Sequence, residues 1–142
     1  MSTASKRARP ALRRTGPRQT PQPPPDLRPL FTALKTLLAR HARHLRVVHD
    51  APDEYYLDSR KPAPDGKPMF FGAVELTRSH VAYRLMPLQV DPTLAAALSP
   101  ALRKQMRGKN AFNFTEADPQ VLEELDRLTR AAMASFERKG RA

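Results

Sequence analysis

Two features of the stretch RGKNAFNF could bind a phosphate or a base. Gly108-Lys109 is the pair that ends a phosphate-binding loop, and Phe112 and Phe114 are spaced to stack bases on one side of a strand. A phosphate loop also needs a glycine five residues before the glycine of that pair, where this chain has Arg103. It must follow a strand and open a helix, whereas the pattern here predicts a helix first and a strand afterwards. We therefore interpret Gly108 as a helix terminator and both phenylalanines as core residues.

Histidine and acidic side chains could bind a cation or transfer protons. The best group is His49 with the acids that follow it, Asp50, Asp53, Glu54 and Asp58. His41 and His44 lie among arginines, which repel a metal ion, and the adjacent Ser79 and His80 do not make a catalytic triad. The chain has no cysteine, which excludes disulfides, thiolate metal sites and a cysteine nucleophile. The residues name no catalytic set, no metal site and no cofactor, and we favour a protein that is not an enzyme.

The elements that position these residues follow from hydrophobic periodicity. Apolar residues at spacings of three and four predict a helix of about five turns that is capped by Asp26 and reaches Leu45. Alternating runs predict strands in LRVVHD, EYYLDS, MFFGAVELT, HVAYRLM and NAFNF. Further helices are predicted in DPTLAAAL, in SPALRKQMR and from Pro119 onward. The sequence therefore predicts one α+β domain over residues 26–140: a small, mainly antiparallel sheet of about five strands with three to four helices packed on it.

A predicted hairpin defines the candidate binding face. If MFFGAVELT and HVAYRLM form a tight hairpin, one apolar face pairs Leu76 with Val81, Val74 with Tyr83 and Gly72 with Leu85. The opposite face carries Phe71, Ala73, Glu75, Ala82, Arg84 and Met86, and places Glu75 and Arg84 as diagonal neighbours in a modest ion pair.

We expect this second face to bind a small anionic ligand or a protein partner. Apolar side chains beside a few cationic and polar groups suit such a ligand. The predicted ligand-binding residues are Arg84, Lys109, Asn113, Phe71, Met86 and Tyr56. The alternative is that a further element or the partner subunit of a homodimer covers the face.

The N-terminal 25 residues differ in composition from the rest of the chain. The net charge of the whole chain is +11. The N-terminal segment has no acid and carries six of the cations, Lys6, Arg7, Arg9, Arg13, Arg14 and Arg18. It also holds six prolines and, after Met1, a single large apolar residue, Leu12, so we expect residues 1–25 to form a disordered basic tail. Such a tail could bind the phosphates of nucleic acid, which is the second functional hypothesis.

Composition also bears on the compartment. No apolar run approaches the roughly 20 residues that span a bilayer, and the N-terminus lacks the apolar core of a signal peptide. With no cysteine, the chain fits a reducing compartment. We expect a cytoplasmic protein with no membrane partner.

Three stretches carry a family resemblance: EYYLDS, GKPMFFGAVELTRSHVAYRLMP and LSPALRKQMRGKNAFNF. Over about residues 27–140 the chain resembles small bacterial proteins of the YdhG-like domain family, which has no settled function. The resemblance implies a compact α+β fold. A frataxin-like role in iron handling has been proposed for some members, and it is the third hypothesis. Arg84 stands where the family usually has histidine, and Ala111 where it usually has cysteine, which counts against iron binding at those two positions.

Overall fold

The computed structural model describes residues 26–139. Six antiparallel strands form one sheet in the order β1-β2-β3-β4-β6-β5. The strands are β1 (Leu45–Ala51), β2 (Glu54–Ser59), β3 (Phe70–Leu76), β4 (Val81–Leu85), β5 (Met106–Arg107) and β6 (Ala111–Phe114). The helices are α1 (Arg28–Ala39), the 3₁₀ helix η1 (Ala42–His44), α2 (Pro87–Val90), α3 (Pro92–Ala96), α4 (Pro100–Lys104) and α5 (Pro119–Arg138). The predicted small α+β fold is confirmed.

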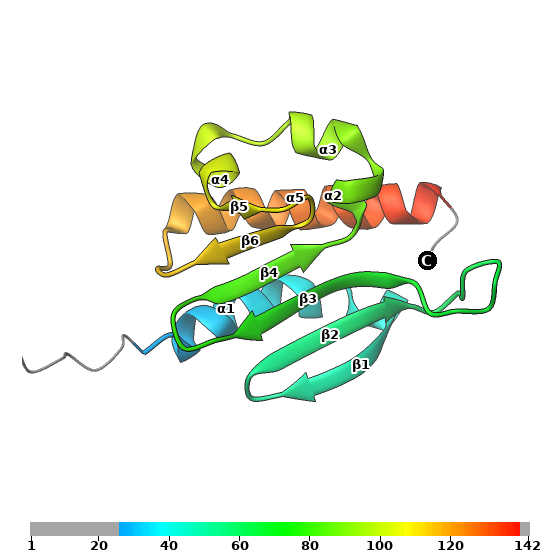
Figure 1. The fold of residues 1–142 in the computed structure, drawn as a ribbon, viewed down its shortest axis with the longest axis horizontal. Coiled ribbons are helices and arrows are strands. Elements are labelled where there is room, and N and C mark those ends of the chain that lie inside the picture. Colours follow the sequence, from blue (N-terminus) through cyan, green and yellow to red (C-terminus); the bar gives the residue numbers. More distant parts are fainter. Residues whose placement is uncertain (1–25, 140–142) are drawn as a thin grey trace, which may run out of the picture.

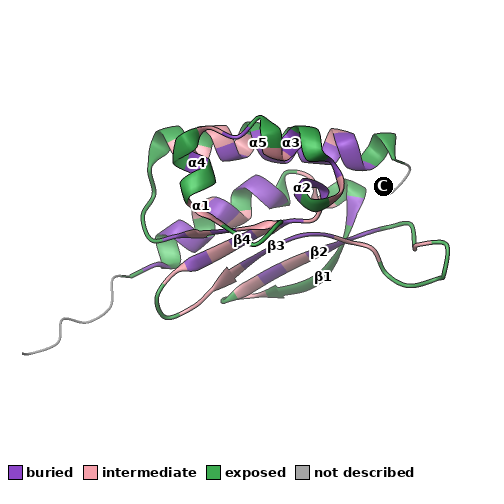
Figure 2. Cartoon of the chain, turned by 45° about the horizontal axis from the view of Figure 1, so that its top comes forward, coloured by how far each residue is buried: buried purple, intermediate pink, exposed green. Residues whose placement is uncertain are grey.

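The β3–β4 hairpin has the register that alternation predicts. Leu76 pairs with Val81, Val74 with Tyr83 and Gly72 with Leu85. The inward side chains of β4 are buried and the intervening ones half-buried, so one face of the strand lies against the core (Figure 2). This agreement follows because a register shift of one residue would move every apolar side chain to the other face.

The core lies between the sheet and the two long helices. In Figure 1, α1 and α5 lie behind the strands, on one side of the sheet. Both helices are amphipathic and bury one apolar stripe, which includes Leu34 and Leu38 in α1 and Leu125 and Phe136 in α5. Phe112 and Phe114 of β6 are also buried, which confirms their interpretation as core residues. The resulting arrangement has two layers, and no helix of the described residues covers the second face of the sheet.

Two predicted helix starts are confirmed, and the predicted length of the first helix is wrong. Ser99 caps α4 by accepting a hydrogen bond from the N–H of Leu102, and Asp118 caps α5 through the N–H of Gln120. α1 begins at Arg28 after Leu27 and ends at Ala39, and Leu45 belongs to β1. A leucine fits a buried helix position and a buried strand position equally well, which is why spacing alone extended the helix too far.

Gly108 does not terminate a helix. α4 ends at Lys104, and Met106 and Arg107 form the short edge strand β5. Gly108 lies in the turn between β5 and β6 with a φ of +67°, a conformation that favours glycine. Pairing with Phe112 and Ala111 draws residues 106–107 into the sheet as one side of a short hairpin, and this strand pairing overrides the helical pattern of SPALRKQMR.

Candidate functional site on the open face of the sheet

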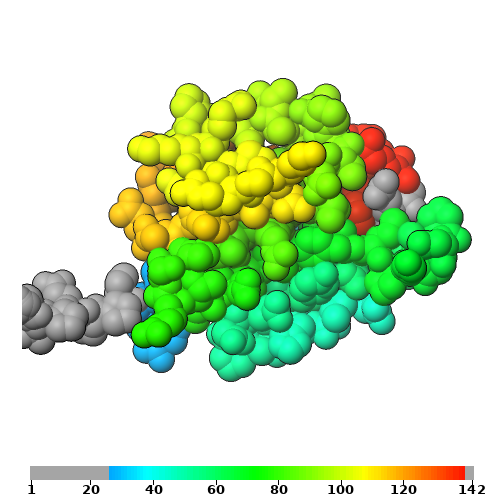
Figure 3. Space-filling model, viewed as in Figure 1, coloured from blue at the N-terminus to red at the C-terminus, as the bar shows by residue number. Residues whose placement is uncertain are grey.

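The open face of the sheet is a row of register partners that crosses all six strands. From β1 to β5 the row contains His49, Tyr56, Ala73, Arg84, Ala111 and Arg107. Figures 1 and 3 look onto this side of the molecule, where no helix of residues 26–139 lies over the strands. We call this surface, with the side chains that flank the row, the open face.

An aromatic and cationic cluster occupies the centre of the open face. The rings of Tyr56 and Phe70 have centroids 4.7 Å apart and are inclined by 32°. The guanidinium carbon of Arg84 lies 6.0 Å from the centroid of Phe70, at the outer limit of a cation–π contact. Burial is the main cause that raises the pKa of Tyr56. Tyr56 and Arg84, which were predicted separately as ligand-binding residues, therefore lie in one cluster. Phe70, which the prediction did not include, lies between them.

The prediction that Phe71 belongs to this face is wrong. Its side chain is completely buried, and its ring packs edge-on against Phe136 of α5 with centroids 5.1 Å apart. The cause is a β-bulge: Leu57 pairs with Gly72 but the next residue, Asp58, pairs with Phe70. The extra residue interrupts the alternation and turns Phe71 toward the helices, and Phe70 takes its place on the open face.

The open face carries charges of both signs in loosely held pairs. Glu75 and Arg84 form the predicted diagonal pair, with an oxygen and a nitrogen 4.0 Å apart. The other two pairs are Arg46 with Asp58 and His49 with Glu54, both at 3.7 Å. Burial raises the pKa of Asp58, and the nearby guanidinium of Arg46 partly offsets this effect. Of these pairs, only Arg84–Glu75 has both side chains at least 40% exposed, so it contributes little to folding and its charges can re-pair with a binding partner. Asp58 is buried, and only its partner Arg46 is exposed.

The other predicted ligand-binding residues lie at the margin of this cluster. Asn113 is half-buried on β6 opposite Ala82, on the same face as Arg84. Lys109 is exposed in the β5–β6 turn. Met86 is half-buried at the junction of β4 and α2, where its backbone is already helical. The predicted nucleic-acid contacts Lys6, Arg7, Arg9, Arg13, Arg14 and Arg18 lie outside the described residues.

The structure separates the acids that could have bound a metal. Asp50 faces the helices and forms an ion pair with Lys35 of α1 at 2.8 Å, whereas Asp58 lies on the opposite side of the sheet. Within residues 26–139 no three histidine, aspartate or glutamate side chains gather closely enough to bind a metal ion. The acids that follow His49 are therefore not brought together as a cation site in the described part of the chain.

Ser79 and His80 also do not form a catalytic site. Both Ser79 Oγ and Thr77 Oγ1 lie within hydrogen-bonding distance of His80 Nδ1, at 3.0 and 3.2 Å. Thr77 Oγ1 also donates a hydrogen bond to the carbonyl oxygen of His80. These contacts close the β3–β4 turn, and the sequence does not supply a carboxylate to orient the histidine there. We interpret them as turn-stabilising hydrogen bonds.

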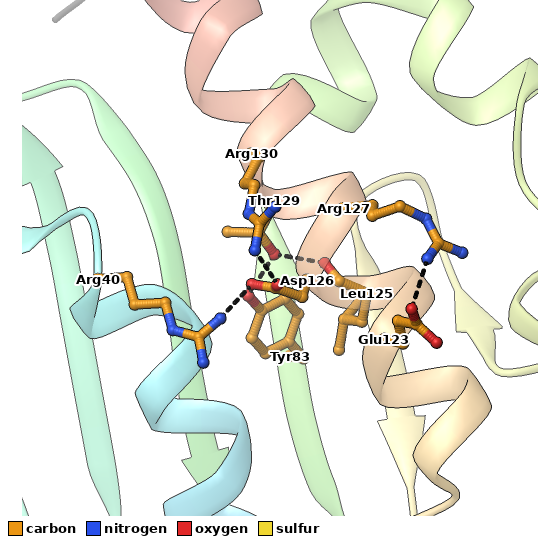
Figure 4. Close-up of polar contacts among 8 residues, drawn as sticks. All are labelled: Arg40, Tyr83, Glu123, Leu125, Asp126, Arg127, Thr129 and Arg130. Carbon is orange, nitrogen blue, oxygen red and sulfur yellow. Dashed lines mark hydrogen bonds and ion pairs between the residues drawn. The ribbon is translucent and has the colours of Figure 1, made fainter.

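A second polar cluster joins the two long helices to β4 (Figure 4). Asp126 of α5 forms ion pairs with Arg40, at 2.8 Å, and with Arg130, at 2.6 Å. Beside it, Thr129 Oγ1 donates a hydrogen bond to the carbonyl oxygen of Leu125, so the hydroxyl of Tyr83, 2.6 Å away, donates to Thr129.

The Tyr83–Thr129 part of this cluster is not accessible to a ligand. Tyr83 and Thr129 are completely buried, and burial raises the pKa of Tyr83 far above its usual range. A phenol that stays protonated and has no access to solvent can neither transfer a proton to a ligand nor bind one. The Asp126–Arg130 pair has the spacing of four residues that brings side chains together on one face of a helix. Arg40 lies 86 residues from Asp126, and no sequence pattern indicated their contact.

Comparison with known proteins assigns neither a family nor a function to the chain. No family model matches the chain, and neither a curated protein nor a solved structure matches it. The resemblance to the YdhG-like family therefore stays a prediction. Among residues 26–139, no helix is both long and apolar enough to cross a membrane.

Proposed function

We propose that the protein is a non-catalytic interaction domain whose open face docks another protein, namely a second copy of the same chain. The observation that carries the proposal is the Tyr56–Phe70–Arg84 cluster at the centre of a sheet face that no described element covers. Tyrosine, phenylalanine and arginine are the residue types enriched in the buried centres of protein interfaces.

The shape of the face supports a protein partner over a small ligand. A small molecule needs a concave site that buries most of its surface. The large hollows among the described residues lie elsewhere, beside α5 and between α1 and the β1–β2 turn. The open face is a continuous strand surface, which suits another broad surface.

The charge pattern supports a second copy as the partner. In a two-fold dimer the same patch meets itself, so it must be complementary to its own pattern. The face carries one pair of opposite charges that are both exposed, Arg84–Glu75, together with the exposed cation Arg46. Arg84 and Glu75 can exchange partners with the second copy across the two-fold axis, because both signs are present on each face.

The size of the face indicates which class of interface it could form. Six strands spaced about 4.8 Å apart and roughly five residues long give a face of about 480 Å² per copy. Two copies would bury about 1,000 Å², which is the lower limit for a specific interface and typical of transient association. We therefore expect a reversible dimer rather than a permanent one.

Sedimentation equilibrium of the full chain tests this proposal. The fraction of dimer is expected to rise with concentration, and Phe70→Glu is expected to weaken dimerisation by at least tenfold because it places a charge in the cluster centre. Lys104→Glu, at the exposed end of α4, is the matched control and should leave the equilibrium unchanged. A chain that stays monomeric up to about 1 mM, or a Phe70→Glu variant that still dimerises, would overturn the proposal. The melting temperature of each variant shows that it is folded.

A further inference from the structure

Two adjoining hollows lie along α5 on the helix side of the molecule. There α3 and α4 lie beside α5 (Figure 2). The apolar end is a hollow of about 410 Å³ lined by the side chains of Leu94, Ala97, Leu98, Leu128 and Ala131. The acidic end is an adjoining hollow of about 440 Å³ that carries Asp118 and Glu123. The two hollows share Ser99, Glu124 and Arg127, and we call them together the α5 groove.

The acidic end is the most negative stretch of the chain. Residues 115–126 hold five of the 14 acids and no lysine, arginine or histidine. Among the ion pairs of residues 26–139, none involves Glu116 or Asp118. Glu124 accepts hydrogen bonds from the N–H and hydroxyl of Ser99, but these neutral donors do not cancel its charge. Glu123 has only an exposed pair with Arg127. With three acids, Asp118, Glu123 and Glu124, against the single cation Arg127, the groove carries a net negative charge next to an apolar floor.

The N-terminal segment of the chain has the complementary pattern. Its six cations are accompanied by no acid, and Leu12 is its only large apolar residue after Met1. Arg9, Arg13 and Arg14 flank this leucine in the sequence RPALRR. Leu12, flanked by arginines, is therefore complementary to the α5 groove, whose apolar hollow lies beside acidic side chains.

We propose that residues 9–14 of the chain dock in the α5 groove of the same molecule. Leu12 fills the apolar hollow, and the arginines face the acids at the start of α5. The tether is long enough, because residues 15–25 span about 34 Å when extended, and a domain of this size is about 34 Å across. In Figure 1 the described chain begins on the left side of the molecule, and the N-terminal end of α5 lies on the same side.

Tethering makes a modest attraction sufficient. A short linker that can span the two sites holds its ligand at an effective concentration on the order of 1 mM, so a contact with an intrinsic dissociation constant near 1 mM is already half occupied. Charge attraction between arginines and carboxylates is screened by salt, with a Debye length of about 10 Å at 0.1 M and about 3 Å at 1 M. Docking should therefore be strong at low salt and lost at high salt.

Paramagnetic relaxation in the full chain tests the contact. The chain has no cysteine, so Ala8→Cys gives one attachment site for a nitroxide next to the segment. In ¹⁵N spectra, the amides of Ala97, Gln120 and Ala131 are expected to broaden selectively, and those of Ala82 and Ala111 on the open face to stay sharp. The broadening should fall at least twofold in 1 M salt and in Leu12→Asp. A mixture of ¹⁵N chain without label and spin-labelled chain without ¹⁵N should show no broadening.

Charge reversal supplies a matched control. Glu123→Lys reverses the charge of an acid that lines the acidic end and pairs only with Arg127, and it should reduce the broadening at least twofold. Asp53→Lys, in the β1–β2 connection, should not. Glu123 and Asp53 are both exposed, so each variant is expected to fold. Uniform broadening, broadening on the open face, broadening only in the mixed sample, or an unchanged effect in Leu12→Asp would each overturn the proposal.

Discussion

Replacing Phe71 with alanine is expected to destabilise the domain far more than replacing its neighbour Phe70. Phe71 is completely buried and packs on Phe136, so its loss leaves a cavity in the core and should cost about 3–5 kcal/mol. Phe70 is half-buried and contacts Tyr56 and Arg84 on the open face, which amounts to about 1 kcal/mol. The difference arises entirely from the bulge in β3, because unbroken alternation would exchange the two environments.

Thermal unfolding followed by circular dichroism measures both effects. In a domain of this size 1 kcal/mol corresponds to about 4 °C, so Phe71→Ala should lower the melting temperature by about 12–20 °C and Phe70→Ala by about 4 °C. The same pair separates stability from binding, since only Phe70→Ala should weaken self-association. Equal losses for the two variants, or the larger loss for Phe70→Ala, would refute the assignment of Phe71 to the core and of Phe70 to the open face.

Three further predictions concern the fold. A methyl group at Gly72 would lie 2.8 Å from a main-chain oxygen of β4, so Gly72→Ala should cost about 3 kcal/mol in chemical unfolding. Tyr83→Phe removes the buried hydrogen bond to Thr129 and should cost about 1 kcal/mol, and a neutral result in the same assay would show that the bond contributes nothing. Hydrogen bonds from Ser135 and Thr93 lower the pKa of Asp91 to about 2, below its unfolded value of 3.8. Its stabilisation is therefore present above about pH 4 and lost as the pH falls toward 2, and Asp91→Asn should flatten that loss in acid titrations of stability.

The sequence predicted the fold well wherever local pattern and burial agree. Alternation predicted the β3–β4 register, and the cap residues Ser99 and Asp118 marked two helix starts. The diagonal Glu75–Arg84 pair follows from the same register, and the structure confirms it. In each case residues close in the sequence, or paired across one hairpin, determine the local geometry.

The features that sequence reasoning missed depend on which strands pair, and the local pattern of apolar residues does not determine this. The bulge that places Phe70 on the open face and Phe71 in the core arises where β3 pairs with β2, and no residue in the local sequence indicates it. The strand at Met106 exists because β6 lies beside it, so Gly108 was assigned to a helix end instead of a hairpin turn. The candidate site was therefore predicted in outline, with Tyr56, Arg84 and Asn113 on the correct face and one aromatic residue on the wrong one.

The most direct test of the open face as a self-docking surface is a charge exchange in sedimentation equilibrium. Arg84 and Glu75 are neighbours on that face, 4.0 Å apart, and both are partly exposed. If the face meets its own copy, Arg84→Glu and Glu75→Arg should each weaken the dimer at least tenfold, and the double variant should restore most of the affinity because complementary signs are again present. A double variant as weak as the single ones, or single variants with unchanged association, would contradict the account.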